Sequence, residues 1–233
     1  MSEYDPTETR RKVVDAAAAH VVFDGWSVET LDAAITDAKV DPDTAAQVYP
    51  RGAIDLAEAF HLEGDAQLAA ALEQANLDHL RYSQRVAHAV MLRLEIAAPD
   101  REAVRRAAAF FALPVNAVTG ARCLWNTADV IWTGLGDTSR DANWYSKRAI
   151  LSAVYSSSLL FWLGDDSPDF SATRAFVDRR IDNVMAFEKS KASLKKTRAY
   201  ELFRRGPGRL LDAIKAPGQS AADDLPGIWQ DQK

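Results

Sequence analysis

Residues 28–49 read VETLDAAITDAKVDPDTAAQVY, and this stretch predicts two short helices with a turn between them. Apolar residues recur at helical spacing from about Val28 to Ala38, which predicts a helix there. Asp41-Pro42-Asp43 then turns the chain, and Asp43 is placed to cap a short helix that ends before Pro50. Two short helices joined by a tight turn predict a helix–turn–helix unit.

One more helix is expected upstream of this unit. Thr7 is placed to cap it and Gly25 to end it, and its apolar face carries Val13, Val14, Ala17 and Val21. The three helices together predict a small tri-helical head over residues 1–51.

The rest of the chain also reads as helical, because alanine is abundant and no convincing β alternation is found. The expected helices span Gly52–His61, Asp65–Ala97, Asp100–Ala112, Val115–Thr133, Asp141–Leu163 and Ser167–Phe187. The stripe expected in the helix over 115–133 is formed by Ala121, Leu124, Trp125, Ala128, Ile131 and Trp132. The helix over 141–163 is apolar around much of its circumference, so it is expected to lie centrally. We therefore predict an all-α protein with a head, a helical-bundle body over 52–188 and a basic segment with a tail over 189–233.

Composition fits a packed protein that does not span a membrane. Of its residues, 48% are hydrophobic, which is enough for a core. Cys123 is the single cysteine, so no intrachain disulfide forms. The polar, acidic start over 1–9 has no features of a signal or transit peptide. The longest uncharged run, 149–164, is too short to cross a bilayer. These features predict a cytoplasmic protein that is soluble or peripheral to the inner membrane.

Charge is unevenly distributed along the chain. Residues 1–61 hold five Lys or Arg and twelve Asp or Glu, a net of −7, whereas residues 189–215 hold nine basic and two acidic residues, a net of +7. Two ends of opposite sign indicate different surroundings, or else simply two solvated faces.

Motifs for catalysis or metal binding are missing from the sequence. There is no phosphate-binding glycine loop, no Cys/His set with zinc spacing and no pair of Glu-x-x-His motifs for a di-iron bundle. His88, near Arg85 and Glu95, is the one acid–base candidate, and a structural histidine explains it better. We therefore expect no catalytic, metal-binding or cofactor-binding residues, although a hydrolase or oxidoreductase with a copurifying cofactor remains an alternative.

DNA binding is the second alternative, since a tri-helical head before a helical body is similar to TetR-type ligand-sensing regulators. A DNA reader needs Lys and Arg facing phosphates. Residues 40–49, the turn and the third helix, carry two acidic residues and no basic one. This pattern argues against DNA binding.

A longer pattern resembles a known family. Residues 129–132 read DVIW, residues 136–149 read GDTSRDANWYSKRA, Tyr155 follows, and residues 166–170 read DSPDF. Together with HV at 20–21, GW at 25–26 and FALP at 111–114, these stretches resemble the lipid-binding accessory proteins of ubiquinone (coenzyme Q) biosynthesis, the ninth of the Coq set. The resemblance spans roughly residues 8–190.

The resemblance implies a TetR-like fold that has lost DNA binding, a homodimer, and an apolar cavity for lipids such as isoprenoid quinone intermediates. It also implies a partner, the di-iron hydroxylase that acts on demethoxyubiquinone. The family's partner surface transfers onto Ile131, Trp132, Asp137, Asn143, Trp144, Tyr145 and Arg148. An ion-pair network of Asp137, Asp141 and Arg148 is the structural alternative for part of this set.

Two further sets are expected on the same basis. The lipid cavity is assigned to Phe111, Leu113, Leu124, Trp125, Ile150, Leu151, Val154 and Tyr155, which form ordinary core unless a volume is left open between them. Contact with an anionic membrane surface is assigned to Lys189, Lys191, Leu194, Lys195, Lys196, Arg198, Leu202, Phe203, Arg204 and Arg205. This segment departs from the closing amphipathic helix of the family, and a solvated basic helix is the alternative.

Overall fold

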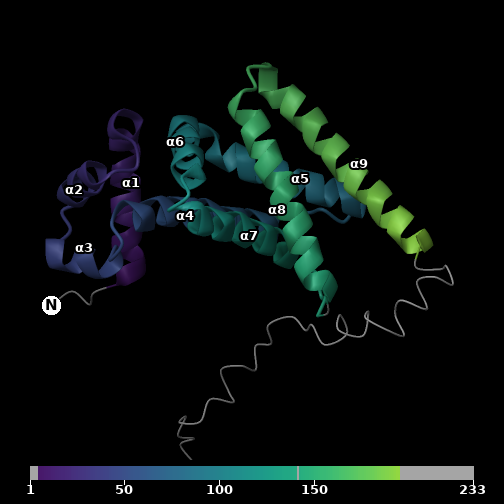
Figure 1. The fold of residues 1–233 in the computed structure, drawn as a ribbon, viewed down its shortest axis with the longest axis horizontal. Coiled ribbons are helices and arrows are strands. Elements are labelled where there is room, and N and C mark those ends of the chain that lie inside the picture. The colour runs from purple at the N-terminus through teal and green to yellow at the C-terminus, as the bar shows by residue number, and fades with distance from the viewer. Residues whose placement is uncertain (1–4, 141, 195–233) are drawn as a thin grey trace, which may run out of the picture.

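The computed structural model describes residues 5–140 and 142–194, and every regular element in them is helical. Figure 1 shows α1, α2 and α3 grouped at one end of the molecule, with α8 and α9 crossing the other end. The helices are α1 (Pro6–Asp24), α2 (Val28–Asp37), α3 (Pro42–Val48), α4 (Ala53–Gln74), α5 (Tyr82–Ala97), α6 (Arg101–Ala112), α7 (Ala117–Gly134), α8 (Ala142–Leu163) and α9 (Ser171–Leu194), with short 3-10 turns η1 (Ala98–Asp100) and η2 (Pro168–Phe170). The predicted all-α class is confirmed.

Two helix starts differ from the sequence prediction. The caps are Asp5 and Asp41, whose carboxylates accept hydrogen bonds from the backbone N–H of Thr7 at 2.8 Å and of Thr44 at 3.0 Å. Thr7 and Asp43 therefore lie inside the first turns and do not cap them. The reason is the Asp-Pro pair at each start: the residue before a proline is held extended, and proline suits the first helical position.

The break expected between residues 61 and 65 does not occur. α4 runs unbroken through this stretch, and the chain instead leaves the helix at Ala75 and re-enters one at Tyr82. A turn forms there because the Asn76 side chain accepts from the N–H of Asp78 and the Arg85 guanidinium donates to two loop carbonyls. Gly64 lies inside α4, and the Arg93 side chain of α5 packs over it.

The buried face of α7 is also rotated from the expected stripe. Ala121 is exposed and Leu124 and Trp125 are only partly buried. The buried residues are instead Thr119, Gly120, Cys123, Thr127, Ala128, Ile131 and Trp132. Small and hydroxylated residues allow α7 to lie closely along α4, with which it shares its largest contact (Figure 1). Hydrogen bonds that join Thr127 of α7 to Asp65 and His61 of α4 therefore help to set which side of α7 faces the core.

α8 packs between α7 and α9, as expected for a central helix, although Leu160 near its end is 61% exposed. The next helix begins at Ser171, later than the predicted 167, because residues 168–170 form the 3-10 turn η2. Asp165 explains this start, since its carboxylate accepts from both the backbone N–H and the hydroxyl of Thr173. α9 continues past the predicted end at 187.

Two separate cores hold the molecule together. The head core joins α1, α2 and α3 with the first turns of α4 and with Ala103 and Ala107 of α6. The body core joins the later part of α4 with α5, α7, α8 and α9. α4 and α6 link the two, and the domain limits at 51/52 and 188/189 remain a prediction. Within the described residues, no helix is both long and apolar enough to cross a bilayer.

Candidate functional site

A cavity of about 590 Å³ lies where the head meets the body. Its wall is built from α1, α4, α5, α6, α7 and α8, so it exists only because both cores are in place. Much of the wall is apolar, notably Val104, Ala107, Ala108, Phe111, Leu124, Leu159 and Leu160. A volume of this size falls in the range of about 300–1,000 Å³ typical of small-molecule sites.

Three of the eight residues assigned to a lipid cavity line this one: Phe111, Leu124 and Tyr155. The other five do not. Leu113 is 50% exposed in the α6–α7 turn, Trp125 packs on Tyr145, Ile150 is half-buried, and Leu151 and Val154 belong to the body core. A helix places only one side in a given wall, and neighbours along α8 point away from the side that carries Tyr155.

Part of the cavity wall is polar, because His61 and Arg93 line it, and their partners Asp65, Asn126 and Thr127 lie outside the lining. The buried carboxylate of Asp65 accepts hydrogen bonds from Arg93 Nε at 2.8 Å, Asn126 Nδ2 at 2.9 Å and Thr127 Oγ1 at 2.8 Å. Arg93 also donates through Nη2 to the carbonyl of His61 at 3.0 Å. The side chains of Asp65 and Arg93 are only 2% and 5% exposed. Such a pair is retained only when both ions are well hydrogen-bonded, as they are here.

His61 completes this polar cluster, which we define as His61, Asp65, Arg93, Asn126 and Thr127. Its Nε2 lies 2.8 Å from Thr127 Oγ1 and 3.1 Å from the carbonyl oxygen of Cys123. Because a carbonyl only accepts, Nε2 carries the proton and Nδ1 is left as an acceptor. Burial lowers the pKa of His61 to about 4, with Asp65 opposing and Arg93 adding to the shift, so the ring is neutral at pH 7.

The polar cluster was missed by sequence reasoning, which assigned no role to its members. One signal was present: a glycine, Gly64, stands directly before Asp65 and three residues after His61. A Cβ at this glycine would lie 2.6 Å from Arg93 Nη2, so the glycine lets the guanidinium cross the helix. The partners of Asp65 could not be predicted, because Arg93 and Thr127 lie 28 and 62 residues away in the sequence.

Two other ionisable groups at the cavity, the Cys123 thiol and the Tyr155 phenol, stay protonated at pH 7. Burial raises the pKa of the Cys123 thiol to about 12, so it stays protonated. Burial likewise raises the pKa of the Tyr155 phenol. Across the described residues there is no group of three or more His, Cys, Asp or Glu side chains suited to a metal ion. The arrangement therefore suits binding of a ligand through hydrogen bonds and apolar contact.

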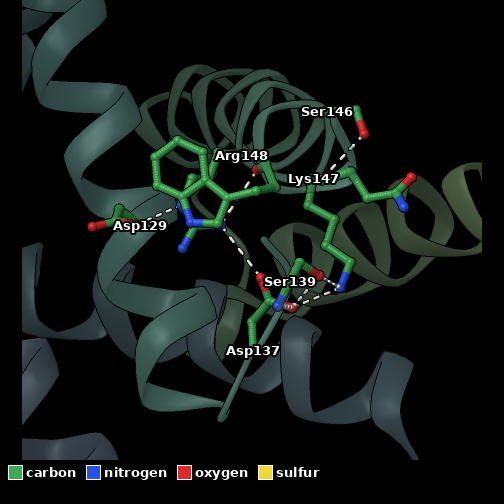
Figure 2. Close-up of polar contacts among 8 residues, drawn as sticks. Asp129, Asp137, Ser139, Ser146, Lys147 and Arg148 are labelled. Carbon is green, nitrogen blue, oxygen red and sulfur yellow. Dashed lines mark hydrogen bonds and ion pairs between the residues drawn. The ribbon is translucent and has the colours of Figure 1, made fainter. Parts of the chain in front are cut away.

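A second polar group lies at the corner between α7 and α8 (Figure 2). The buried guanidinium of Arg148 bonds Asp129 through Nε and Asp137 through Nη1, and Lys147 Nζ lies 2.6 Å from Asp137. Ser139 Oγ donates to the same carboxylate at 2.8 Å. Burial alone would raise the pKa of Asp137, but the bonds from Lys147 and Ser139 outweigh it and hold the pKa below its ordinary value.

These corner residues belong to the segment that matches known proteins. A family model described as COQ9 matches residues 117–188, which contain α7, α8 and most of α9. The COQ9-B ubiquinone biosynthesis protein of Xenopus laevis is 32% identical over 198 residues, covering 81% of this chain and 67% of that protein. This chain belongs to the COQ9 family.

Further COQ9 relatives match over a similar extent. A probable coq9 protein of Dictyostelium discoideum is 31% identical over 196 residues, or 82% of this chain, and the Homo sapiens COQ9 protein is 27% identical over 203 residues, or 84% of this chain. Each is named as a mitochondrial ubiquinone biosynthesis protein. The chain spans 64% of the length of each of these two relatives.

The fold has a match among solved structures. A TetR transcriptional regulator from Nitrosomonas europaea aligns with a TM-score of 0.59, covering 75% of this chain and 97% of that one. Sequence identity is 19%, so the likeness concerns the fold alone. It confirms the predicted TetR-like architecture of this COQ9 member.

The residues assigned to the COQ9 partner surface divide into buried and accessible ones. Ile131 and Trp132 lie in the body core, at 0% and 7% exposure, and the Asp137 and Arg148 side chains are each 3% exposed. These four cannot form a docking face themselves; the ion pair between the last two, at 3.3 Å, confirms that part of the structural alternative.

The accessible residues are Asn143, Trp144 and Tyr145 at the start of α8. Trp144 is half-buried, with Arg148 Cζ 3.9 Å from its ring centroid, and Tyr145 is 37% exposed. The two rings meet edge to face at 4.8 Å, and Trp125 packs against both. The buried ion pairs therefore hold a small aromatic surface in place.

The residues assigned to membrane contact cannot be placed. Lys189, Lys191 and Leu194 fall in the last turns of α9, where only the backbone is described. The others lie outside the described residues: Lys195, Lys196, Arg198, Leu202, Phe203, Arg204 and Arg205.

Proposed function

We propose that this chain is a non-catalytic accessory protein of ubiquinone biosynthesis that binds isoprenoid quinone intermediates. Membership of the COQ9 family, whose relatives are named as ubiquinone biosynthesis proteins, supports the pathway. The cavity between head and body is the observation that carries the binding role, because it combines a largely apolar wall with a few convergent polar groups.

Burial of the isoprenoid tail of the ligand explains how such a protein can carry a water-insoluble intermediate. Removing each methylene from water is worth roughly 0.8 kcal/mol, so an isoprenoid tail partitions strongly into an apolar cavity. A cavity of about 590 Å³ holds the ring and the first part of a tail. The polyprenyl intermediate can then leave the bilayer without being exposed to water.

Deletion of the gene tests the pathway role. The deletion strain is expected to accumulate the demethoxy intermediate and to lose ubiquinone, and expression of the chain should restore it. Mass spectrometry of lipids that copurify with the protein should find isoprenoid quinones. Normal ubiquinone content in the deletion strain would show that the proposal is wrong.

Presentation to the di-iron hydroxylase is the second part of the proposal. The aromatic surface of Trp144 and Tyr145 supports it, because partly exposed aromatic residues backed by buried ion pairs are typical of binding hot spots. Arg148 keeps Asp129 and Asp137 when the Trp144 ring is removed, so the fold should survive.

Trp144→Ala and Trp144→Lys are expected to weaken hydroxylase binding by about ten-fold or more, with a modest change in melting temperature. Phe23→Ala is the matched control, since that ring is 80% exposed on the head. Pull-down with the hydroxylase beside thermal melting measures both effects. Proportional loss of binding and stability would assign Trp144 to the core.

Transcriptional regulation is disfavoured despite the TetR-like fold. The helix in the position of a DNA reader is α3 (Pro42–Val48), which is capped by Asp41, has Asp43 in its first turn and carries no basic residue. Phosphate contacts from Lys and Arg supply most of the affinity for DNA. A mobility-shift assay at low salt is expected to give no sequence-specific complex.

A further inference from the structure

Two residues of the polar cluster line the cavity, and each keeps one hydrogen-bonding atom without a partner among the described residues. Arg93 lines the cavity, and its Nε and Nη2 are engaged by Asp65 and the His61 carbonyl. Its Nη1 has no hydrogen-bond partner in the described part of the chain. His61 also lines the cavity, and its Nδ1 is an acceptor with no partner among the described residues. A donor and an acceptor thus remain unused in a site whose arginine side chain is 95% buried, being 5% exposed.

Charge at the cavity restricts what these atoms can bind. The charge of Arg93 is already balanced by Asp65, at 2.8 Å, so the interior offers donors without a net positive charge. Three more carboxylates line the wall: Asp15, Glu63 and Asp100. Asp15 and Asp100 are exposed, so they place negative charge on the part of the wall that solvent reaches. An anionic head, such as a fatty acid carboxylate or a lipid phosphate, is therefore repelled.

We propose that Arg93 and His61 recognise the head of a neutral lipid whose ring carries both hydrogen-bond-accepting and hydrogen-bond-donating oxygens. This inference rests on the proposed function and deepens it by naming the groups that select the ligand. A carbonyl or methoxy oxygen accepts from Arg93 Nη1, and a phenolic hydroxyl donates to His61 Nδ1. The tail then follows the apolar wall past Val104, Ala108 and Leu159 toward the exposed Leu160.

The ligand therefore enters ring first. The opposite orientation would bury an isoprenoid hydrocarbon against the Arg93 guanidinium, leaving its donor unpaired, and buried unpaired polar groups are costly. With the ring inside, the head's polar atoms are satisfied in the interior and the remaining tail stays at the apolar opening beside Leu160.

Binding of matched probes to the full chain and to variants tests the inference. The probes are ubiquinone with a short isoprenoid tail, in its quinol form, the same tail as a hydrocarbon without the ring, and a fatty acid of similar length. Arg93→Met is combined with Asp65→Leu, because removing one partner alone leaves a buried charge, whereas replacing both keeps the volume. His61→Phe is the second variant, since the Thr127 hydroxyl still donates to Asp65 in its absence.

The wild-type chain is expected to bind the quinol more tightly than the hydrocarbon or the fatty acid. In the double variant the quinol dissociation constant should rise about ten-fold or more, and in His61→Phe by a smaller factor. The hydrocarbon should bind to both variants at least as tightly as to the wild type, because no polar group that it leaves unpaired has been added. Calorimetric titration measures the dissociation constants of the three probes, and a melting curve verifies that each variant is folded.

Three outcomes would overturn the inference. If either folded variant binds the quinol as the wild type does, or if the wild type prefers the fatty acid, the head group is not read by these residues, although lipid binding stands. If the wild type binds neither the quinol nor the hydrocarbon, the proposed function itself fails, and this inference with it.

Discussion

Gly64 shows how one residue allows Arg93 to pack against α4 at the cavity wall. The helix axis of α4 and the Arg93 side chain from α5 approach so closely that an ideal Cβ on Gly64 would overlap all three terminal atoms of the guanidinium, at 2.6–2.8 Å. Glycine is a poor helix former, costing about 1 kcal/mol relative to alanine. That cost is accepted because the arginine must cross at this point to reach Asp65.

Gly64→Ala is therefore expected to destabilise the protein by about 2 kcal/mol, although alanine is the better helix former, because overpacking displaces the guanidinium from Asp65. Ala66→Gly, at an exposed site in the same helix, is the matched control and should cost about 1 kcal/mol through helix propensity alone. Urea unfolding measures both. A stabilising effect of Gly64→Ala would mean that Arg93 has free space to move.

His61 makes stability depend on pH. Its pKa of about 4 in the folded protein lies below the ordinary value of 6.5, so between these values the unfolded chain binds more protons. Stability from this group is complete above pH 6.5 and falls as the pH decreases toward 4. Going from pH 7 to pH 5 should remove about 2 kcal/mol from the free energy of unfolding.

Comparison with His61→Gln isolates this contribution from that of the carboxylates. The variant should lose less stability than the wild type over the same pH interval, when unfolding by urea is followed at several pH values. Equal pH slopes in the two proteins would indicate that His61 is not held neutral by burial.

At the scale of elements, α6 determines how the end of α8 is fixed. Arg101 Nη2 donates to the carbonyls of Trp162 and Asp165 at 2.7 and 2.8 Å, and Arg105 Nη2 to that of Leu163 at 2.6 Å. The last carbonyls of a helix have no partner within the helix, so cations from a neighbouring helix satisfy them. α6 also lines the cavity, through Val104, Ala107 and Ala108 among others, so these bonds hold two of its wall helices together.

Arg101→Leu should lower the free energy of unfolding by about 2 kcal/mol, because two carbonyls lose a charged donor and Trp162 loses the cation near its ring. Arg106→Leu, one turn along the same helix, is the control. Its bond to Glu102 is exposed, so its effect should stay within about 0.5 kcal/mol. Similar losses in both variants would show that capping of α8 contributes little.

For the molecule as a whole, the acidic and the basic part of the sequence lie at opposite ends of the chain. The head, acidic in sequence, lies at one end of the described structure, and α9 leads away from the other (Figure 1). We propose that the basic segment after 188 attaches the protein, as a homodimer, to an anionic membrane surface on the cytoplasmic side. Each Lys or Arg near such a surface contributes about 1 kcal/mol.

A chain that ends at Phe187 is expected to keep its fold and its dimer, because the described core residues all precede that point. It should lose flotation with anionic liposomes, whereas the intact chain floats and is released as salt is added. Light scattering and thermal melting monitor assembly and folding. Equal flotation of the two chains would show that the segment is not the anchor.

Local chemistry in the sequence determined much of the fold. Helical periodicity placed Val13, Val14, Ala17 and Val21 in the head core, and Gly25 ends α1 as expected, with a positive φ of 67°. Such features depend on neighbours within a few residues, so they can be predicted without a partner. The pattern over 129–170 likewise identifies the family from the sequence alone, because residues close together in the chain carry it.

Only the tertiary structure decided the site. The cavity requires six helices to surround one volume, and the polar cluster joins Asp65 to Arg93 and Thr127 across 28 and 62 residues. Of the stripe predicted for α7, Ala128, Ile131 and Trp132 are buried as expected, whereas Leu124 and Trp125 are only partly buried. The polar Thr127, which donates to Asp65 of α4, is fully buried and was not predicted to be. Periodicity reports how apolar each face is, whereas burial of a polar face depends on whether another helix satisfies it.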